Sequence, residues 1–394
     1  MSDLPVSDTI ATPVRHELDE LLGSLGGQQG PLLSLYLDVY AGNDPNAPRQ
    51  RADGALRALP LGRDARGRFE RQLLYELRGA SEGTLVAFLD EDPKGLLATR
   101  LLKVAPPLPG GSDPAAARWG DAWTAPLELL MACEDPVVAV FADERRARVF
   151  VQDLGEVSEA SAYVRAMDPG GWRRYSENAT GVPGTPARGG SGQDDFASRT
   201  EAWTARFVAD VIVRVESAVA AHDGTRLVLL GDDRRRSQLQ EALPVPLKGS
   251  LLGSGPAPAD PDLDVARWSE PLGAFVREAL HQEDRRMLAE LESSGVSGTG
   301  EVLAALSRGE LATVVIGADV DVDVVRCLGT DWLAESEEAA RRVCPDGPIE
   351  RTPLKQHLTT TAKRGRARIR VLRGPDEEAL LARIGPVAGL PRRG

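Results

Sequence analysis

The sequence lacks several features that define large protein classes. The 394-residue chain contains no run of 18 or more apolar residues, so no membrane-spanning helix is predicted. The N-terminal segment, MSDLPVSDTI, has no basic stretch followed by an apolar one, so we expect no signal peptide and a cytoplasmic protein. Apolar residues make up 42% and charged residues 27% of the chain, which is typical of globular rather than disordered proteins.

Cysteine and histidine are both scarce. The three cysteines, Cys133, Cys327 and Cys344, are odd in number, and none forms a C-x-x-C pair. We therefore expect buried free thiols rather than disulfides or metal ligands. The four histidines lie far apart in the sequence and match no zinc-ligand spacing. The sequence thus predicts no metal site, and we expect no other cofactor.

Positive charge is in deficit as well, because the chain carries a net charge of −12. This argues against a surface that binds nucleic acid throughout. One segment is the exception: residues 351–373 carry eight cations and no acid, which leaves −20 on the rest of the chain. The eight are Arg351, Lys355, Lys363, Arg364, Arg366, Arg368, Arg370 and Arg373. Such a distribution is consistent with RNA contact at one place and with no DNA partner; a solvated, positively charged strand and turn is the alternative.

Helical and β patterns alternate along the chain, which predicts an α/β (α+β) protein. Since 394 residues exceed the usual size of one hydrophobic core, we expect three domains, each a small mixed sheet with helices. Their predicted bounds are residues 1–130, 131–222 and 223–394. The last is expected to be an αβα sandwich, because the apolar strand 311–316 resembles strands that are covered on both faces.

Several elements follow from the periodicity. In the first domain Leu33, Leu35, Leu37 and Val39 share one face of a predicted strand. Two more strands are expected at 84–89 and 96–104, with 105–123 as a linker or an extended excursion. The middle domain should contain a hairpin from 137–141 and 148–152. The third domain should begin with the strand 226–231, contain helices over 271–291 and 298–307, and include a strand over 366–372, in which the arginines alternate with apolar residues.

The longest irregular stretch is residues 163–194, which is rich in Gly, Pro and Arg. Loops longer than about 12–15 residues without structure of their own are usually functional or linkers. From Asp194 or Asp195 a helical pattern runs without Gly or Pro to about Ala221. Its apolar stripe is formed by Phe196, Trp203, Phe207, Val211, Val215 and Val219.

The loop ends in Arg188-Gly189-Gly190-Ser191-Gly192-Gln193, directly before this helix. The glycines permit a close approach to a ligand. The Gln193 amide can position a water or a carbonyl, and its N–H can donate to an oxyanion, although Gln193 cannot act as a general base. The loop also carries cations suited to phosphate groups: Arg165, Arg173, Arg174 and Arg188. The helix N-terminus adds about half a positive charge, whereas Asp194 and Asp195, if they cap the helix, would repel a phosphate there. A disordered surface loop is the alternative.

The order of domains and the stretch RGGSGQDDFASRTEAWTARF resemble the archaeo-eukaryotic class-1 peptide chain release factors and Pelota, in their bacterial branch. The tail ALLARIGPVAGLPRR resembles the Gly-rich C-terminal ending of that family. In release factors the middle-domain loop carries Gly-Gly-Gln, enters the peptidyl transferase centre and promotes water attack on the peptidyl-tRNA ester. The resemblance implies a catalytic Gln193 that orients water, with Gly189 and Gly190 allowing entry. It also implies the ribosome, with its rRNA and tRNA, and a translational GTPase as partners.

The chain departs from the family pattern, because Ser191 and Gly192 separate the glycine pair from Gln193. An intact Gly-Gly-Gln lies at 26–28, before the first strand, and we interpret it as a coincidence. No codon-reading motif is recognisable. Three functions stay open: a peptidyl-tRNA ester hydrolase in ribosome rescue, a non-catalytic hibernation factor in the A site, and an interaction module unrelated to translation. The predicted RNA-binding residues are Arg165, Arg173, Arg174, Arg188, Lys363, Arg364, Arg366, Arg368 and Arg370.

Overall fold

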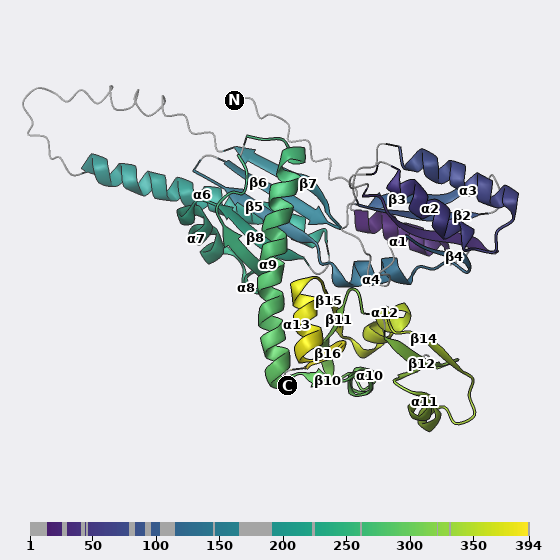
Figure 1. Cartoon of the computed structure of the whole chain (residues 1–394). Coiled ribbons are helices and arrows are strands. Elements are labelled where there is room, and N and C mark those ends of the chain that lie inside the picture. The colour runs from purple at the N-terminus through teal and green to yellow at the C-terminus, as the bar shows by residue number, and fades with distance from the viewer. Residues whose placement is uncertain are drawn as a thin grey trace, which may run out of the picture. The chain divides into compact units, whose positions relative to one another are not determined.

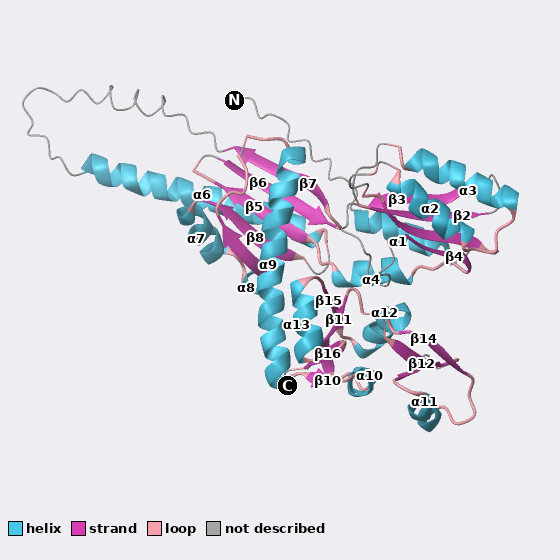
Figure 2. Ribbon diagram, viewed as in Figure 1, coloured by secondary structure: helices cyan, strands magenta, loops and turns pink. Residues whose placement is uncertain are grey.

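A computed structural model describes the chain over residues 14–25, 30–40, 44, 46–78, 83–90, 96–102, 115–144, 146–164, 191–222, 225–260, 262–320, 322–330 and 332–392 (Figure 1). These residues form twelve helices and four sheets, which confirms the α/β class (Figure 2). They gather into two compact units, one around a five-stranded sheet and one that holds the three other sheets. Within the described ranges, no helix combines the length and the apolar composition that crossing a membrane requires.

The N-terminal sheet has the strand order β3-β2-β1-β4 and is antiparallel throughout. Its region contains α1 (Val14–Leu25), β1 (Leu32–Asp38), α2 (Ala47–Arg57), α3 (Arg63–Glu76), β2 (Thr84–Asp90), β3 (Leu96–Leu102), β4 (Ala115–Gly120) and α4 (Ala125–Cys133). The predicted alternation in β1 is confirmed, since Leu33, Leu35 and Leu37 pack in the core with α2 and α3. The opposite face of β1 is buried as well. There the Tyr36 hydroxyl donates to the Trp123 carbonyl at 2.6 Å.

The five-stranded sheet has the order β7-β6-β5-β8-β9. Its elements are β5 (Val137–Ala142), β6 (Arg146–Asp153), β7 (Glu156–Val164), α6 (Ser191–Ala220), β8 (Arg226–Gly231), α7 (Asp233–Ala242), α8 (Val245–Gly249) and β9 (Leu251–Gly255), followed by α9 (Val265–Ser294). The predicted hairpin is confirmed by the antiparallel pairing of β5 and β6, in which Phe141 faces Arg148. The strands β8 and β9 add to it in parallel.

The C-terminal sheet has the order β10-β16-β11-β15. A three-stranded sheet, β13-β12-β14, is formed by the segment between β11 and β15 in the sequence. The elements are β10 (Val296–Ser297), α10 (Thr299–Ser307), β11 (Leu311–Gly317), β12 (Asp323–Cys327), β13 (Trp332–Ala334), α11 (Glu337–Val343), β14 (Ile349–Pro353), α12 (Lys355–Gly365), β15 (Arg368–Leu372), α13 (Pro375–Arg383) and β16 (Val387–Pro391). Side chains of α10 and α12 pack with Val314 on one face of β11. Side chains of α9 and α13 pack with Val315 on the other. The expected αβα sandwich is therefore confirmed.

Helix α4 contributes to two cores of the same unit. Leu127 and Leu130 pack with α1 and β1, whereas Leu129 and Cys133 pack with α10, α12 and β11. The Arg15 guanidinium donates to the Met131 and Glu134 carbonyls at the C-terminal end of this helix. Residues of the first and last thirds of the chain thereby belong to one compact unit.

Several sequence expectations differ from the structure. Residues 115–120, expected in a linker or an extended excursion, form the edge strand β4, which pairs with β1 and lacks an apolar alternation of its own. The helix expected from Pro271 begins six residues earlier, at Val265. It holds Pro271 in its interior, where the fully buried Trp268 and Leu272 offset the lost hydrogen bond. The strand 226–231, expected in the C-terminal domain, lies in the sheet of the hairpin, so the predicted boundary at residue 222 separates a helix and a strand of one sheet. The three-domain division itself stays a prediction.

The expectation of buried free thiols is confirmed for one of the three cysteines. Cys133 is a buried free thiol, as predicted. Cys327 on β12 and Cys344 after α11 form a disulfide, so the expectation of free thiols is wrong for these two. They are 17 residues apart in sequence with Cα atoms 6.4 Å apart, because α11 folds back onto the small sheet. No sequence spacing predicts such a pair.

Candidate functional site

The helix that follows the Gly/Arg-rich loop begins earlier than predicted. Helix α6 starts at Ser191, so Gln193 lies in its first turn and Asp194 and Asp195 are not its caps. One glycine costs a helix only about 1 kcal/mol, which is why Gly192 does not prevent this extension. The first N–H groups of a helix have no acceptor within it and carry a partial positive charge, so Gln193 stands where an anionic or carbonyl ligand is favoured.

The C-terminal part of α6 is anchored on the five-stranded sheet. Phe207, Val211 and Val215 are buried in a core that includes Val140 of β5 and Leu229 of β8, which confirms this part of the predicted stripe. Residues 201 and 202 are exposed, and Figure 1 shows the N-terminal turns of α6 projecting beyond the sheet. The first turn of α6, to which Gln193 belongs, therefore lies beyond the sheet of its own unit.

Six of the predicted site residues lie outside the described residues. They are Gly189 and Gly190 of the proposed tip and the loop cations Arg165, Arg173, Arg174 and Arg188. Their roles stay predictions. The intact Gly-Gly-Gln at 26–28 also lies outside the described ranges.

Four of the predicted RNA-binding cations gather at the end of α12. Lys363 and Arg364 occupy its last turn, Arg366 is the residue that ends it, and Arg368 opens β15. All four side chains are exposed. The Arg364 guanidinium also donates to the Thr330 carbonyl at 3.0 Å. We call these four residues the C-terminal basic patch; its charge and exposure suit contact with phosphate groups.

The other four cations of the segment 351–373 are placed differently. Arg370, predicted to bind RNA, is half-buried and donates from Nε to Asp284 Oδ1 at 2.7 Å. Arg373 pairs with Glu134 at 2.6 Å, and Arg351 lies 3.9 Å from Glu337. Lys355 is buried, and its ammonium donates to the Ala318 carbonyl. Alternation along a strand could not separate these cations, because acids from distant segments pair with some of them.

One cation near the patch was missed by the sequence reasoning. Arg392 is exposed, and its guanidinium donates to the carbonyls of Gly309, Gly365 and Arg366. It therefore borders the C-terminal basic patch, although 24 residues separate it from Arg368. The only sequence signal is the basic Pro391-Arg392-Arg393 ending.

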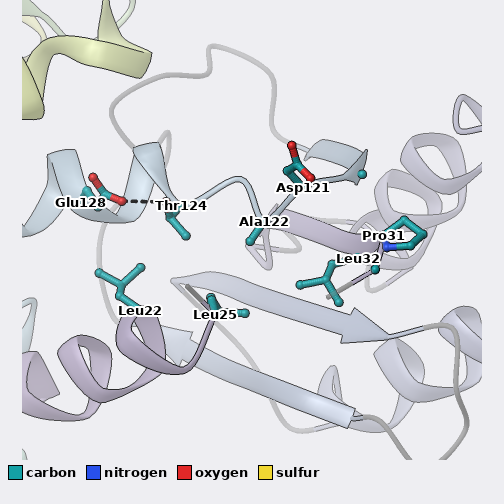
Figure 3. Close-up of a pocket in the computed structure, with 10 residues that line it drawn as sticks. Leu22, Leu25, Pro31, Leu32, Asp121, Ala122, Thr124 and Glu128 are labelled. Carbon is teal, nitrogen blue, oxygen red and sulfur yellow. Dashed lines mark hydrogen bonds between the residues drawn. The ribbon is translucent and has the colours of Figure 1, made fainter. Parts of the chain in front are cut away.

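A cavity of about 650 Å³ lies in the N-terminal region, between α1, the start of β1 and α4 (Figure 3). Leu22, Leu25 and Leu32 line it on the apolar side. Asp121 and Glu128 supply carboxylates, and Glu128 accepts a hydrogen bond from the Thr124 hydroxyl at 2.6 Å. Its described lining contains no cation or histidine, so no positively charged side chain there could stabilise the oxyanion of ester hydrolysis.

One more group could hold a ligand by its chemistry. His281, Asp284 and Asp376 offer ligand atoms that lie within 4.8 Å of one another. Burial raises the pKa of Asp284 above its ordinary value, with the Asp376 carboxylate adding to the effect and Arg370 opposing it. This cluster lies on α9 and α13, and Arg370, one of the residues predicted to bind RNA, contacts it through Asp284.

The middle of the chain matches a known family. Residues 123–272 match the family described as "Bacterial archaeo-eukaryotic release factor family 10". This segment includes the hairpin, the Gly/Arg-rich loop and α6. The resemblance to the bacterial branch of release factors and Pelota is thereby confirmed for the region that carries it. No curated protein matches the chain.

Several solved structures match the chain at low sequence identity and low TM-score. An archaeal translation termination factor, aRF1, is 15% identical, covering 96% of this chain and 98% of that chain with a TM-score of 0.25. Archaeal Pelota, in a model of Pelota and ABCE1 bound to the ribosome, is 12% identical, covering 95% and 94% with a TM-score of 0.39. Dom34 of S. cerevisiae is 10% identical, covering 80% and 74% with a TM-score of 0.34. Since these TM-scores are low, the solved structures carry no argument, and the family match covers residues 123–272.

Proposed function

We propose that the protein is a cytoplasmic, ribosome-associated translation factor that occupies the A site. The observation that carries this proposal is the match of residues 123–272 to a release-factor family, because that segment holds the loop and the helix on which Gln193 is mounted. The C-terminal basic patch supports it with four exposed cations that can meet rRNA phosphates on an otherwise acidic protein. A translational GTPase is a second partner that the resemblance implies.

Hydrolysis of the peptidyl-tRNA ester in ribosome rescue is the chemistry that fits this placement. Gln193 would orient the attacking water with its amide, and the backbone N–H groups of the first turn of α6 would stabilise the oxyanion that forms. Gly189 and Gly190 would allow the tip to approach the ester closely.

A second candidate is a non-catalytic hibernation factor, and one observation favours it. Gln193 lies in the first turn of α6, with Ser191 and Gly192 between it and the glycine pair. Two helical residues shift a side chain by roughly 3 Å along the axis, which is as large as the whole reach of a hydrogen bond. A tip displaced by that distance can still fill the site without positioning a water.

A peptide-release assay on stalled ribosomes distinguishes the two candidates. A hydrolase should release peptide, and Gln193→Ala should abolish release without weakening ribosome pelleting. A hibernation factor should pellet with vacant ribosomes and release nothing, both as the wild-type protein and as the Gln193→Ala variant. Deletion of Ser191 and Gly192 restores the Gly-Gly-Gln spacing, so a gain of release in that variant alone would show that the insertion blocks the chemistry.

Charge reversal in the basic patch tests the ribosome contact itself. Lys363→Glu and Arg368→Glu should weaken pelleting. The logarithm of the binding constant falls as the logarithm of the salt concentration rises, and each lost phosphate contact should make that slope less steep by about 0.7–0.9. Arg286→Glu is a matched control, because Arg286 is exposed on α9, which packs on the opposite face of the C-terminal sheet from α12. No ribosome binding by the wild-type protein, under any salt condition, would instead support an interaction module unrelated to translation.

A further inference from the structure

Three side chains from two helices converge on one face of the C-terminal sheet. His281 and Asp284 are three residues apart on α9, so they point to the same side of that helix. Asp376 is the second residue of α13. The His281 Nδ1 and Asp376 Oδ2 atoms are 2.6 Å apart, and the ligand atoms of all three residues lie within 4.8 Å of one another. The two aspartates are buried and His281 is half-buried.

The cluster contains one permanently charged cation among its described neighbours. Two buried carboxylates face the guanidinium of Arg370, which donates to Oδ1 of Asp284, while His281 adds a positive charge only when it is protonated. A carboxylate has two oxygens, so Asp284 can keep Arg370 on Oδ1 and still offer Oδ2 to another cation. An arginine in that position holds the ligating carboxylate in place, as outer-sphere partners of metal ligands commonly do.

We infer that His281, Asp284 and Asp376 bind a divalent transition-metal ion of the Zn²⁺ or Co²⁺ type. One imidazole nitrogen with two carboxylate oxygens is a donor set that such borderline ions accept, and that is unlike the all-oxygen sites of Ca²⁺ and Mg²⁺. Bonds of about 2.0–2.2 Å place two ligand atoms roughly 3–3.5 Å apart, so Nδ1 and Oδ2 need to separate by less than about 1 Å. The ion would tie α9 to α13.

This site differs from the sequence expectation of no metal. The ligands are separated by 92 residues between Asp284 and Asp376, and only one of them is a histidine. Zinc-ligand spacing in a sequence relies on close pairs of cysteine or histidine, so it cannot reveal a site that the packing of two helices creates.

Titration of the full-length, untagged protein with Co²⁺ and Zn²⁺ after chelator treatment tests the inference. We expect one equivalent of Co²⁺ to bind with visible d–d absorption, Zn²⁺ to displace it, and the ion to raise the melting temperature. His281→Ala and Asp376→Asn should each weaken binding at least tenfold and remove the thermal shift. Circular dichroism of each variant checks that it folds, and Asp376→Asn, which keeps the shape of the side chain, decides the result if His281→Ala does not fold.

Two controls separate this site from other donors. His16→Ala removes a histidine that lies 3.3 Å from Glu20 on an exposed helix face, and it should leave binding unchanged. A Cys327→Ser/Cys344→Ser variant should retain one equivalent, which excludes the cysteines as ligands. The inference is overturned if the wild-type protein binds neither ion at micromolar concentrations, or if binding survives both His281→Ala and Asp376→Asn. Neither result bears on ribosome binding, which is measured separately.

Discussion

Arg370 donates from Nε to Oδ1 of Asp284 across 2.7 Å, and the two side chains are only 19% and 9% exposed. The pair joins β15 to α9 on the face of the C-terminal sheet that α13 also covers. Its placement separates Arg370 from the exposed cations of the C-terminal basic patch, although the sequence groups them. The pair therefore contributes to the stability of this sheet rather than to an RNA-binding surface.

Removal of one partner of this pair should destabilise the folded protein far more than removal of both. Arg370→Leu leaves the Asp284 carboxylate buried without its cation, and we expect it to lower the free energy of unfolding by about 3–5 kcal/mol. The double variant Arg370→Leu/Asp284→Leu removes both charges and should recover most of that loss. Urea denaturation at pH 7 measures both. A double variant as unstable as Arg370→Leu would contradict this account.

The Asp284 carboxyl should also give the protein a pH-dependent stability. Burial raises its pKa above the ordinary value of 3.8, so the folded protein holds this proton more tightly than the unfolded chain does. The stabilising contribution of the group is then present below about pH 4 and is lost as the pH rises through the raised pKa. We expect the free energy of unfolding of the wild type, relative to Asp284→Asn, to fall from about pH 4 upward and then level off. Urea titrations at several pH values check it, and a rising difference would refute it.

The cysteines should differ sharply in reactivity. Burial raises the pKa of Cys133 to about 12, so it is protonated and shielded at pH 8. A thiol-specific chromogenic reagent should therefore label no cysteine in the native protein. It should label one cysteine after denaturation without reductant, because Cys327 and Cys344 are bonded to each other, and three after reduction. Three labelled thiols without reductant would show that the disulfide does not form.

Gly231 should tolerate no side chain. Its φ is +124°, and an added Cβ would lie 2.0 Å from the Ala142 carbonyl oxygen, at the end of the parallel pairing between β5 and β8. We expect Gly231→Ala to lower the free energy of unfolding by about 2–4 kcal/mol, because backbone strain and the clash act together. Gly249→Ala is the matched control, since nothing lies within 4 Å of its added Cβ. Equal effects of the two variants in thermal denaturation would argue against this explanation.

Replacement of Arg366 by glycine should stabilise the fold and weaken ribosome binding. It ends α12 in the left-handed conformation, with φ at +54°, where glycine is preferred over residues with a Cβ. Arg366→Gly should therefore raise the free energy of unfolding by about 1 kcal/mol. The same change removes a cation of the basic patch and should weaken ribosome pelleting, whereas Arg366→Lys should not. A glycine variant that pellets as well as the wild type would exclude Arg366 from the interface.

The sequence predicted the elements whose signal is local. The face of β1 that carries Leu33 and Leu35, the hairpin of β5 and β6, and the stripe of α6 from Phe207 onward all follow from apolar periodicity. The αβα arrangement followed from the apolar strand around Val314 and Val315, because such a strand needs a cover on both faces. The strand β4 escaped prediction, since its small residues carry no alternation and only its pairing with β1 makes it a strand.

Some features of the candidate site could likewise be predicted from the sequence, and others depend on the tertiary structure. The residue types of the loop tip and the concentration of cations near residue 365 are properties of the sequence alone, and they suffice to suggest release-factor chemistry and RNA contact. The tertiary structure alone decided that Gln193 lies inside the first turn of α6, that Asp284 holds Arg370, and that Arg392 borders the patch. It also joined Cys327 to Cys344 and His281 to Asp376. Periodicity reveals which face of an element avoids water, but the partner on that face is chosen by packing between segments that are distant in the chain.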